Sequence, residues 1–175
     1  GGYGISRRNW KIFEGRLTCL KLQKVTLKIK NMGMKAIYPI GWCCIFWLSK
    51  NNKTLYDIEI QGIKKQWNHC TEGWVHSENA INEVGCIHST QGYDLNYAFI
   101  IIGNEMGYDP DKKKIVVRAE NYYDQNGKKT AGYEELLEYI QHIYYVLMTR
   151  GIRGTYLYVS DPNLRDYISR YVDVE

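Results

Sequence analysis

The sequence predicts an α/β domain in which a mostly parallel sheet is flanked by helices and preceded by a β-meander. Residues 97–102 are apolar throughout, which is typical of a strand buried on both faces of its sheet. Strand and helix patterns alternate over the second half of the chain, in the order strand, strand, helix, strand, helix. The 175 residues, 45% of them hydrophobic and 24% charged, suit one globular domain with enough apolar side chains for a core.

The first half of the chain contains strand patterns separated by turn residues. Residues 51–52 are two asparagines and residues 61–62 are Gln-Gly, and both pairs contain residues that tolerate a positive φ. Residues 68–82 are polar and loop-like, and Trp67 and Trp74 are the expected anchors of this segment. The runs that form the predicted meander are 41–49, 54–60 and 63–67.

The second half supplies the strands of the predicted parallel sheet. Residues 84–88 and 97–102 are short apolar runs, and residues 155–160 are rich in Tyr, Leu and Val. We expect these three runs to be neighbouring strands. A further short strand is expected at 115–117, after the turn residues 109–111.

Residues 133–148 predict the clearest helix of the chain. Glu134 and Glu135 stand in its first turn, where the helix dipole favours acidic side chains. Asp161-Pro162 opens a second, final helix. The apolar residues that recur at helical spacing in the first of these helices are Leu136, Ile140, Ile143 and Leu147.

The charge of the chain is unevenly distributed. The net charge is +4, but residues 1–50 contain ten Lys/Arg and one acid, whereas residues 51–175 contain thirteen Lys/Arg and eighteen acids. The basic end is either a footprint for phosphates or a set of solvated lysines. No apolar run approaches the roughly 18 residues that span a bilayer, so no membrane partner is expected. The five cysteines include no CxxC pair and indicate reduced thiols in a cytoplasmic protein.

Common catalytic motifs are absent from the sequence. It contains no GxxxxGK[ST] or GxGxxG loop, no GxSxG elbow and no HExxH pair. His69-Cys70 and Cys86/His88 do not have the spacing of a known zinc site, so no metal is expected. The chain therefore lacks the means to hold a nucleoside triphosphate by itself.

Two segments combine polar residues, glycine and a following strand. In residues 85–97 a predicted strand leads into a polar loop, and ligands of open α/β sheets bind at the carboxyl ends of strands. In residues 145–158 a helix ends on Thr149-Arg150 and a glycine turn leads to a strand. Taken alone, Arg150 equally fits a side chain that caps the last helix carbonyls. We expect the loops 89–94 and 149–154 to lie on the same face.

Both segments resemble motifs of superfamily 1 helicases, in the right order. The run from His88 to Asp94 resembles motif V, and Thr149-Arg150 before the apolar strand resembles motif VI. Together they are similar to the Schlafen group 3-like DNA/RNA helicase domains, a bacterial family formerly of unknown function. The resemblance covers residues 54–172 and is specific in residues 83–103 and 143–159.

The resemblance implies a fragment of a longer protein. It implies that residues 46–175 are the second RecA-like domain of a helicase, with a P-loop NTPase-type sheet, after a basic lead-in at residues 1–45. The start at Gly1 rather than Met fits such a fragment. The P-loop domain would precede it in the parent chain, and ATP and Mg²⁺ would bind to the full-length parent and not to this fragment. Single-stranded DNA or RNA would be the other partner.

The resemblance also implies a role for each motif residue. Arg150 would be the catalytic arginine finger, because a planar guanidinium compensates charge on the γ-phosphate. Asp94 stands where the motif has an acid that meets the ribose. The further residues expected at the nucleotide are Gln91, Gly92, Thr149 and Arg153. Those expected at nucleic-acid phosphates are His88, Ser89 and Thr90.

Two alternatives to a motor domain remain open from the sequence. The first is a nucleic-acid-binding α/β module without ATPase function, which the basic N-terminus and the sixteen tyrosines favour. The second is a structural α/β domain in which Thr149-Arg150 is only a helix end.

Overall fold

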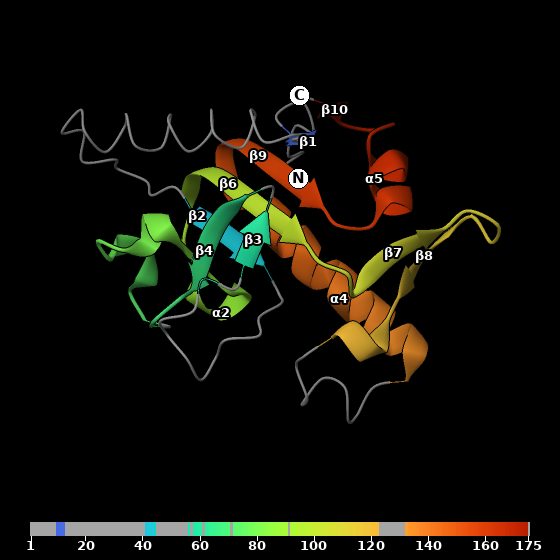
Figure 1. The fold of residues 1–175 in the computed structure, drawn as a ribbon, viewed down its shortest axis with the longest axis horizontal. Helices are drawn as coiled ribbons and strands as arrows, with labels where there is room; N and C mark the ends of the chain where they lie inside the picture. Colours follow the sequence, from blue (N-terminus) through green and yellow to red (C-terminus); the bar gives the residue numbers. More distant parts are fainter. Residues whose placement is uncertain are drawn as a thin grey trace, which may run out of the picture.

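A computed structural model describes residues 10–12, 41–44, 56, 58–60, 62–70, 72–90, 92–122 and 132–174 (Figure 1). The described residues form a mixed α/β fold with one five-stranded sheet and two smaller sheets. The α/β class predicted from the sequence is therefore confirmed. The expected turn at residues 51–52 and the site residue Gln91 lie outside the described residues.

The five-stranded sheet is the centre of the fold, and all its neighbouring strands are parallel. Strands at 97–102 and 155–160 are confirmed as direct neighbours, in register from Ala98 opposite Thr155 to Ile102 opposite Val159. Two strands of the sheet come from the predicted lead-in at 1–45. The strand order is β10 (Asp173–Val174), β1 (Trp10–Ile12), β9 (Gly151–Val159), β6 (Leu95–Ile102) and β2 (Gly41–Cys44).

Helix α4 (Tyr133–Met148) has the bounds predicted from its apolar spacing and covers one face of this sheet (Figure 1). Its four predicted stripe residues are buried, and they pack against β6 and β9 in the larger core. Helix α5 (Pro162–Ile168) follows β9, and the Asp161 carboxylate accepts a hydrogen bond from Leu164 N–H at 2.7 Å. The side chain of Asp161 therefore caps the helix that the sequence predicts after it.

The other face of the sheet packs against a small three-stranded sheet. It consists of β3 (Ile58–Ile60), β4 (Ile63–Trp67) and β5 (Glu83–Val84), and the smaller core joins it to Phe99 and Ile101 of β6. Strands β3 and β4 form a hairpin with φ +81° at Gly62, which confirms the predicted turn there. The predicted meander is otherwise wrong, because β2 lies in the parallel sheet beside β6. The apolar composition of residues 41–44 suits a strand of a parallel sheet as well as one of a meander.

The strand predicted at 84–88 is also wrong. Only Glu83–Val84 is extended, and it pairs with β4 and not with β6. Helix α2 (Ile87–Thr90) follows, and the hydroxyls of Ser89 and Thr90 donate to the Cys86 carbonyl at 3.0 and 2.9 Å. Such bonds between side chain and nearby backbone compete with strand pairing, and here they favour the helical turn.

A second hairpin extends from the carboxyl end of β6. It consists of β7 (Met106–Asp109) and β8 (Lys114–Val117), so the strand predicted at 115–117 and the turn before it are confirmed. In Figure 1 it projects away from the sheet, next to α5. Three short 3₁₀ turns complete the described part, namely η2 (Trp74–His76), η3 (Ala80–Asn82) and η4 (Ala119–Asn121). No helix in the described ranges has the length and apolar character to cross a membrane.

A buried carboxyl lies where β6 passes into this hairpin. Glu105 is 1% exposed, and its Oε1 accepts a hydrogen bond from the Tyr144 hydroxyl of α4. That hydroxyl also accepts from Gly103 N–H at 3.1 Å, while Glu105 Oε2 has no hydrogen-bond partner. Burial raises the pKa of Glu105 above its ordinary value, against the opposing effect of the Tyr144 hydrogen bond.

We expect Glu105 to make the stability of the domain fall as pH rises. The unfolded chain loses the Glu105 proton near its ordinary pKa of 4.5, whereas the folded chain keeps it to a higher pH. The folded state therefore loses stability as the pH rises between the two pKa values, and the loss is complete above the folded one. Glu105→Gln removes this penalty. The free energy of unfolding of the variant, relative to that of the unmodified chain, should therefore increase as pH rises. Urea unfolding from pH 4 to 8 measures this difference, with the exposed Glu138→Gln as control. Parallel pH profiles for the Glu105→Gln variant and the unmodified chain would contradict the prediction.

Candidate functional site

The two motif segments meet at one edge of the parallel sheet. Leu95, the first residue of β6, donates its N–H to the Arg150 carbonyl at 2.9 Å, and Leu95 pairs with Gly151 at the start of β9. The loops before β6 and before β9 therefore lie side by side, as predicted. They lie at the amino ends of both strands, however, and the expected carboxyl edge is wrong. The reason is that the strand before the first loop belongs to the small sheet, so this loop leads into β6 only.

Helix α2 uses two of the predicted site residues to hold its own shape. Ser89 is fully buried, and its hydroxyl accepts from Cys86 N–H at 2.9 Å. Thr90 is 1% exposed and bonded to the same residue's carbonyl. His88 is exposed on the same turn. Of these three predicted nucleic-acid contacts, only His88 presents its side chain to solvent.

The loop after α2 is open to solvent at both of its described site residues. Gly92 has φ +81°, and a Cβ added there would have no atom within 4 Å. Its backbone is therefore accessible, and its left-handed conformation favours glycine. Asp94 is exposed. The loop presents an open peptide and a carboxylate at the edge where Arg150 precedes β9.

A hydrogen-bond network around the buried Glu83, which the sequence did not indicate, includes Trp74 of η2, and η2 also contacts this loop. The Glu83 carboxylate accepts hydrogen bonds from His69 Nδ1 at 2.9 Å, Trp74 Nε1 at 2.8 Å and Asn79 Nδ2 at 2.7 Å. Next to Trp74, in η2, the His76 ring meets the Tyr93 ring edge to face at 5.5 Å. The predicted anchoring role of Trp74 is thus confirmed. The sequence did not indicate that Glu83 is buried, because a single acidic residue after Asn82 in a polar segment is usually a surface residue.

Thr149 and Arg150 both bond to the last turn of α4. Thr149 Oγ1 donates to the Val146 carbonyl at 2.8 Å, and Arg150 Nε donates to the same carbonyl at 3.2 Å. Arg150 is half-buried, and no ion pair joins it to another residue in the described ranges. The Nε bond fixes the side chain against the helix while leaving the charge of the guanidinium uncompensated there.

A bulge at the start of β9 exposes Arg153. Between Leu95/Gly151 and Tyr97/Gly154, β9 advances one residue more than β6. The extra length turns Ile152 and Arg153 to solvent. Gly151 is packed so closely on the Gly154 carbonyl and the Thr155 hydroxyl that a Cβ would overlap both. The glycine therefore permits the bulge that follows Arg150.

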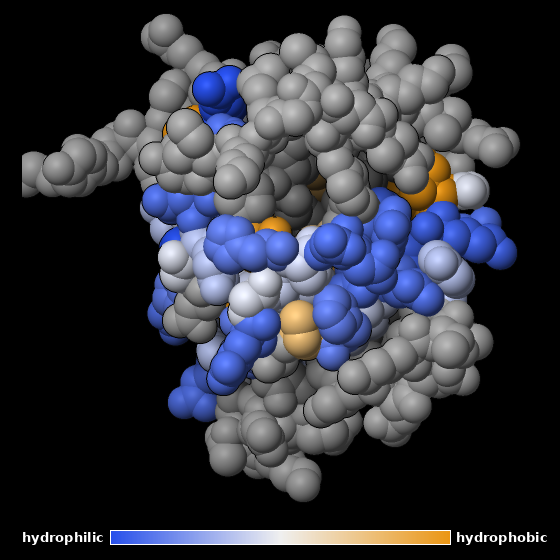
Figure 2. Space-filling model, turned by 90° about the vertical axis from the view of Figure 1, so that its left-hand side faces the viewer, coloured by the Kyte–Doolittle hydropathy of each residue, from blue (hydrophilic) through white to orange (hydrophobic). Residues whose placement is uncertain are grey.

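The site as a whole is polar and carries mainly positive charge. Among the predicted site residues, Arg150 and Arg153 carry two positive charges and Asp94 carries one negative charge. His88 lies six residues before Asp94 in the chain. Figure 2 looks at the left-hand side of the view in Figure 1, and hydrophilic residues predominate among its coloured atoms. In the described ranges, no group of three or more His, Cys, Asp or Glu side chains could hold a metal ion. Two guanidinium groups beside an open backbone have the chemistry to bind a phosphate-bearing ligand.

Comparisons with known proteins agree with the resemblance to this helicase domain family. The family model described as Schlafen group 3, DNA/RNA helicase domain matches residues 20–161, and so reaches into the segment before residue 45. An uncharacterized protein of Saccharomyces cerevisiae, YPL245W, is 37% identical over 102 residues, which are 55% of this chain. The matched part is 22% of the yeast protein, so the chain corresponds to a minor share of that relative. No solved structure matches the chain.

Proposed function

The chain belongs to the Schlafen group 3 DNA/RNA helicase domain family, and on this premise we propose that it is a motor domain of a longer ATP-dependent helicase or translocase. In this proposal residues 46–175 form the second RecA-like domain, and β1 and β2 from the preceding segment complete its central sheet. A preceding P-loop domain of the parent chain supplies the phosphate cradle and the Mg²⁺ ligands, since the present sequence contains no P-loop. The nucleic acid is single-stranded DNA or RNA.

One observation carries the proposal. The hydrogen bond from Leu95 to Arg150 joins the two motif segments, which are 55 residues apart in the sequence, at one edge of the sheet. A nucleotide held by a facing domain at this edge can then meet Arg150 from one loop and Gly92 from the other. Simultaneous contact of this kind is what a shared nucleotide site between two domains requires.

Arg150 has the chemistry of an arginine finger in this arrangement. Its Nε is occupied by the Val146 carbonyl, and the two terminal nitrogens form the end that reaches a ligand. A guanidinium pre-positioned by a backbone bond pays less conformational entropy when it meets the γ-phosphate. Thr149, bonded to the same carbonyl, holds the helix end from which Arg150 extends.

The remaining motif residues divide between nucleotide and nucleic acid. The exposed Asp94 would accept a hydrogen bond from the ribose, and Gln91, Gly92 and Arg153 would lie along the phosphates. His88 would contact the nucleic-acid backbone. Ser89 and Thr90 would act through the shape of α2, because both hydroxyls already bond to Cys86.

The isolated chain should bind single-stranded nucleic acid and hydrolyse no ATP. We expect affinity that falls steeply with salt and depends little on sequence, since phosphate contacts release counterions. Fluorescence anisotropy with a labelled oligonucleotide at two salt concentrations measures the first property, and ATP turnover with Mg²⁺ measures the second. Metal-dependent turnover by the chain alone would contradict the fragment proposal, and absent binding at low salt would remove nucleic acid from its partners.

A nucleic-acid-binding module without motor activity is the second candidate. The bond from Arg150 Nε to Val146 favours it, because this bond also explains Arg150 as a helix cap. The two candidates differ in the full-length parent. Only the motor proposal predicts that Arg150 controls the rate of ATP hydrolysis there.

A further inference from the structure

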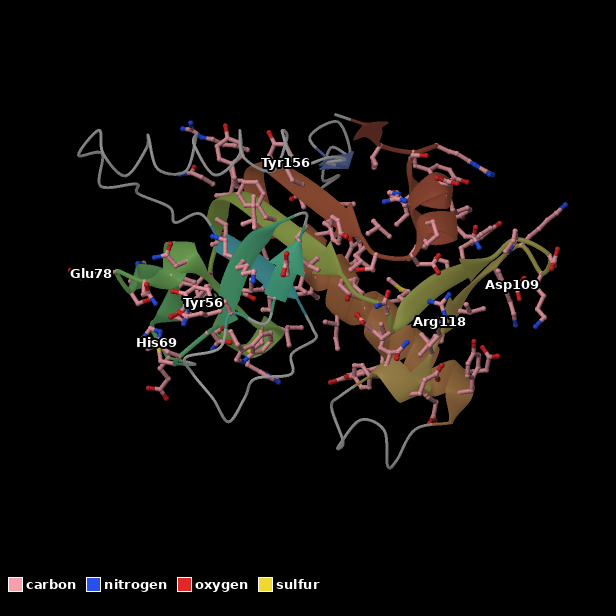
Figure 3. All side chains as sticks on the ribbon, in the orientation of Figure 1. Tyr56, His69, Glu78, Asp109, Arg118 and Tyr156 are labelled. Carbon is pink, nitrogen blue, oxygen red and sulfur yellow. The ribbon has the colours of Figure 1, made fainter. Side chains whose placement is uncertain are left out.

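The β7–β8 hairpin presents lysines on a turn of fixed shape, at the edge opposite to the motif loops. Figure 3 shows Asp109 near its tip and Arg118 at its base, both far from His69 on the other side. Asp109 Oδ1 accepts the N–H groups of Asp111 and Lys112, each at 3.0 Å. Lys113 has φ +51°, a left-handed conformation that closes the turn. The tip lysines, Lys112, Lys113 and Lys114, are all exposed.

The hairpin is braced against the rest of the domain. Arg118 Nη2 donates to Asp161 Oδ2 at 2.6 Å, and its guanidinium lies over Gly107, where an added Cβ would come within 2.6 Å of it. The Tyr108 ring stacks on the Tyr167 ring of α5 at 4.4 Å. Because these contacts join β7 and the residue that follows β8 to α5 or to Asp161 before it, the hairpin is held in place and its tip projects as an arm.

An exposed aromatic ring continues this stack. Tyr171 meets the Tyr167 ring edge to face at 5.4 Å and is 59% exposed. A large exposed aromatic side chain gains little from the core of its own domain, and its open face suits a stacking partner. The three rings of Tyr108, Tyr167 and Tyr171 thus lead from the hairpin to an open surface.

The charge of this region differs from that of the surrounding chain. Segments 106–118 and 161–171 together contain six basic and four acidic residues, whereas residues 51–175 contain more acids than bases. Two of the four acids are already engaged, Asp161 by Arg118 and Asp109 by Lys112 at 3.4 Å. Lys113 and Lys114 therefore stand free of a described ion pair at the end of the arm.

We propose that the tip lysines and Tyr171 form a second contact surface for single-stranded nucleic acid, with the lysines on phosphates and the Tyr171 ring on a base. Lysine charges with an adjacent aromatic platform are the combination that binds single strands without sequence preference. The inference rests on the proposed nucleic-acid partner and adds a separate surface to it. The eight residues of β6 separate the two edges by about 26 Å at the usual strand rise, so the two surfaces are distinct.

The charge part of the proposal is tested on the whole chain with a labelled single-stranded 12-mer. In Lys113→Asn/Lys114→Gln, Asn suits the left-handed turn and Lys112 keeps its bond to Asp109. We expect the slope of log affinity against log salt to become shallower by about 1.4, for two lost phosphate contacts. The control, Lys64→Gln, removes an exposed lysine on β4 that pairs with Glu59 and should leave the slope unchanged.

The stacking part is tested with Tyr171→Ala, which should lower affinity about tenfold, while Tyr171→Phe keeps the ring and the affinity. Tyr139→Ala removes a ring of α4 that is also exposed, to 46%, and should leave the affinity unchanged. Circular dichroism shows that each variant is folded. If the lysine double variant and Tyr171→Ala are folded and bind like the unmodified chain, this inference is overturned and the proposed function is not affected. Absent binding by the unmodified chain at low salt overturns the proposed function and this inference with it.

Discussion

Arg150→Ala in the full-length parent should lower the rate of ATP hydrolysis by on the order of 10³-fold, by analogy with other arginine fingers. The expected loss is this large because the guanidinium acts on charge that develops in the transition state at the γ-phosphoryl oxygens. Nucleotide binding should remain nearly unchanged. Steady-state turnover and nucleotide affinity, measured on the same preparation, test both expectations.

The bond from Arg150 Nε to the Val146 carbonyl gives the competing explanation. If Arg150 only caps α4, its loss costs about 1 kcal/mol of stability and leaves turnover near normal. Arg150→Lys separates the two roles, because lysine keeps the cation and lacks the planar fork. We expect Lys to restore the melting temperature and not the rate. Near-normal turnover with a lowered melting temperature in Arg150→Ala would make the cap explanation correct.

Trp74→Ala should destabilise the domain by roughly 3–5 kcal/mol, the usual cost of deleting a buried tryptophan. Trp74 is fully buried, and its ring lies so close to Gly85 that a Cβ on that residue would come within 2.5 Å. Its Nε1 also donates to the buried Glu83 carboxylate, which would lose a partner. Urea unfolding measures the free-energy change.

Two further variants show how much of the destabilisation by Trp74→Ala comes from the hydrogen bond and how much from the ring. Trp74→Phe keeps most of the ring contact and removes the indole donor, so it should cost about 1–3 kcal/mol, for a buried acceptor left short of a bond. Tyr56→Ala removes an aromatic ring that is 55% exposed and should be nearly neutral. A Trp74→Ala variant as stable as Tyr56→Ala would contradict the role of Trp74 as the anchor of the 72–82 segment.

Local patterns in the sequence predicted two kinds of element: a helix with one buried apolar stripe, and a strand with both faces buried. Apolar spacing predicted α4 with its bounds, and the continuous apolar run predicted β6, because burial of a regular element requires those periods. The motif residues on either side of these elements predicted that two loops meet. Their meeting is confirmed by the bond between Leu95 and Arg150.

The pairing of the strands, and hence the edge at which the loops lie, follows from long-range contacts of the folded chain. Residues 84–88 and β2 are apolar runs like β6, and nothing in their composition distinguishes one sheet from another. Strand pairing depends on backbone hydrogen bonds between distant segments, which leave no periodic signal in either one. The same holds for Glu83, whose three side-chain donors gather around it from the loop that precedes it. The sequence determined which residues could form the site, and long-range pairing decided that they stand at the amino ends of β6 and β9.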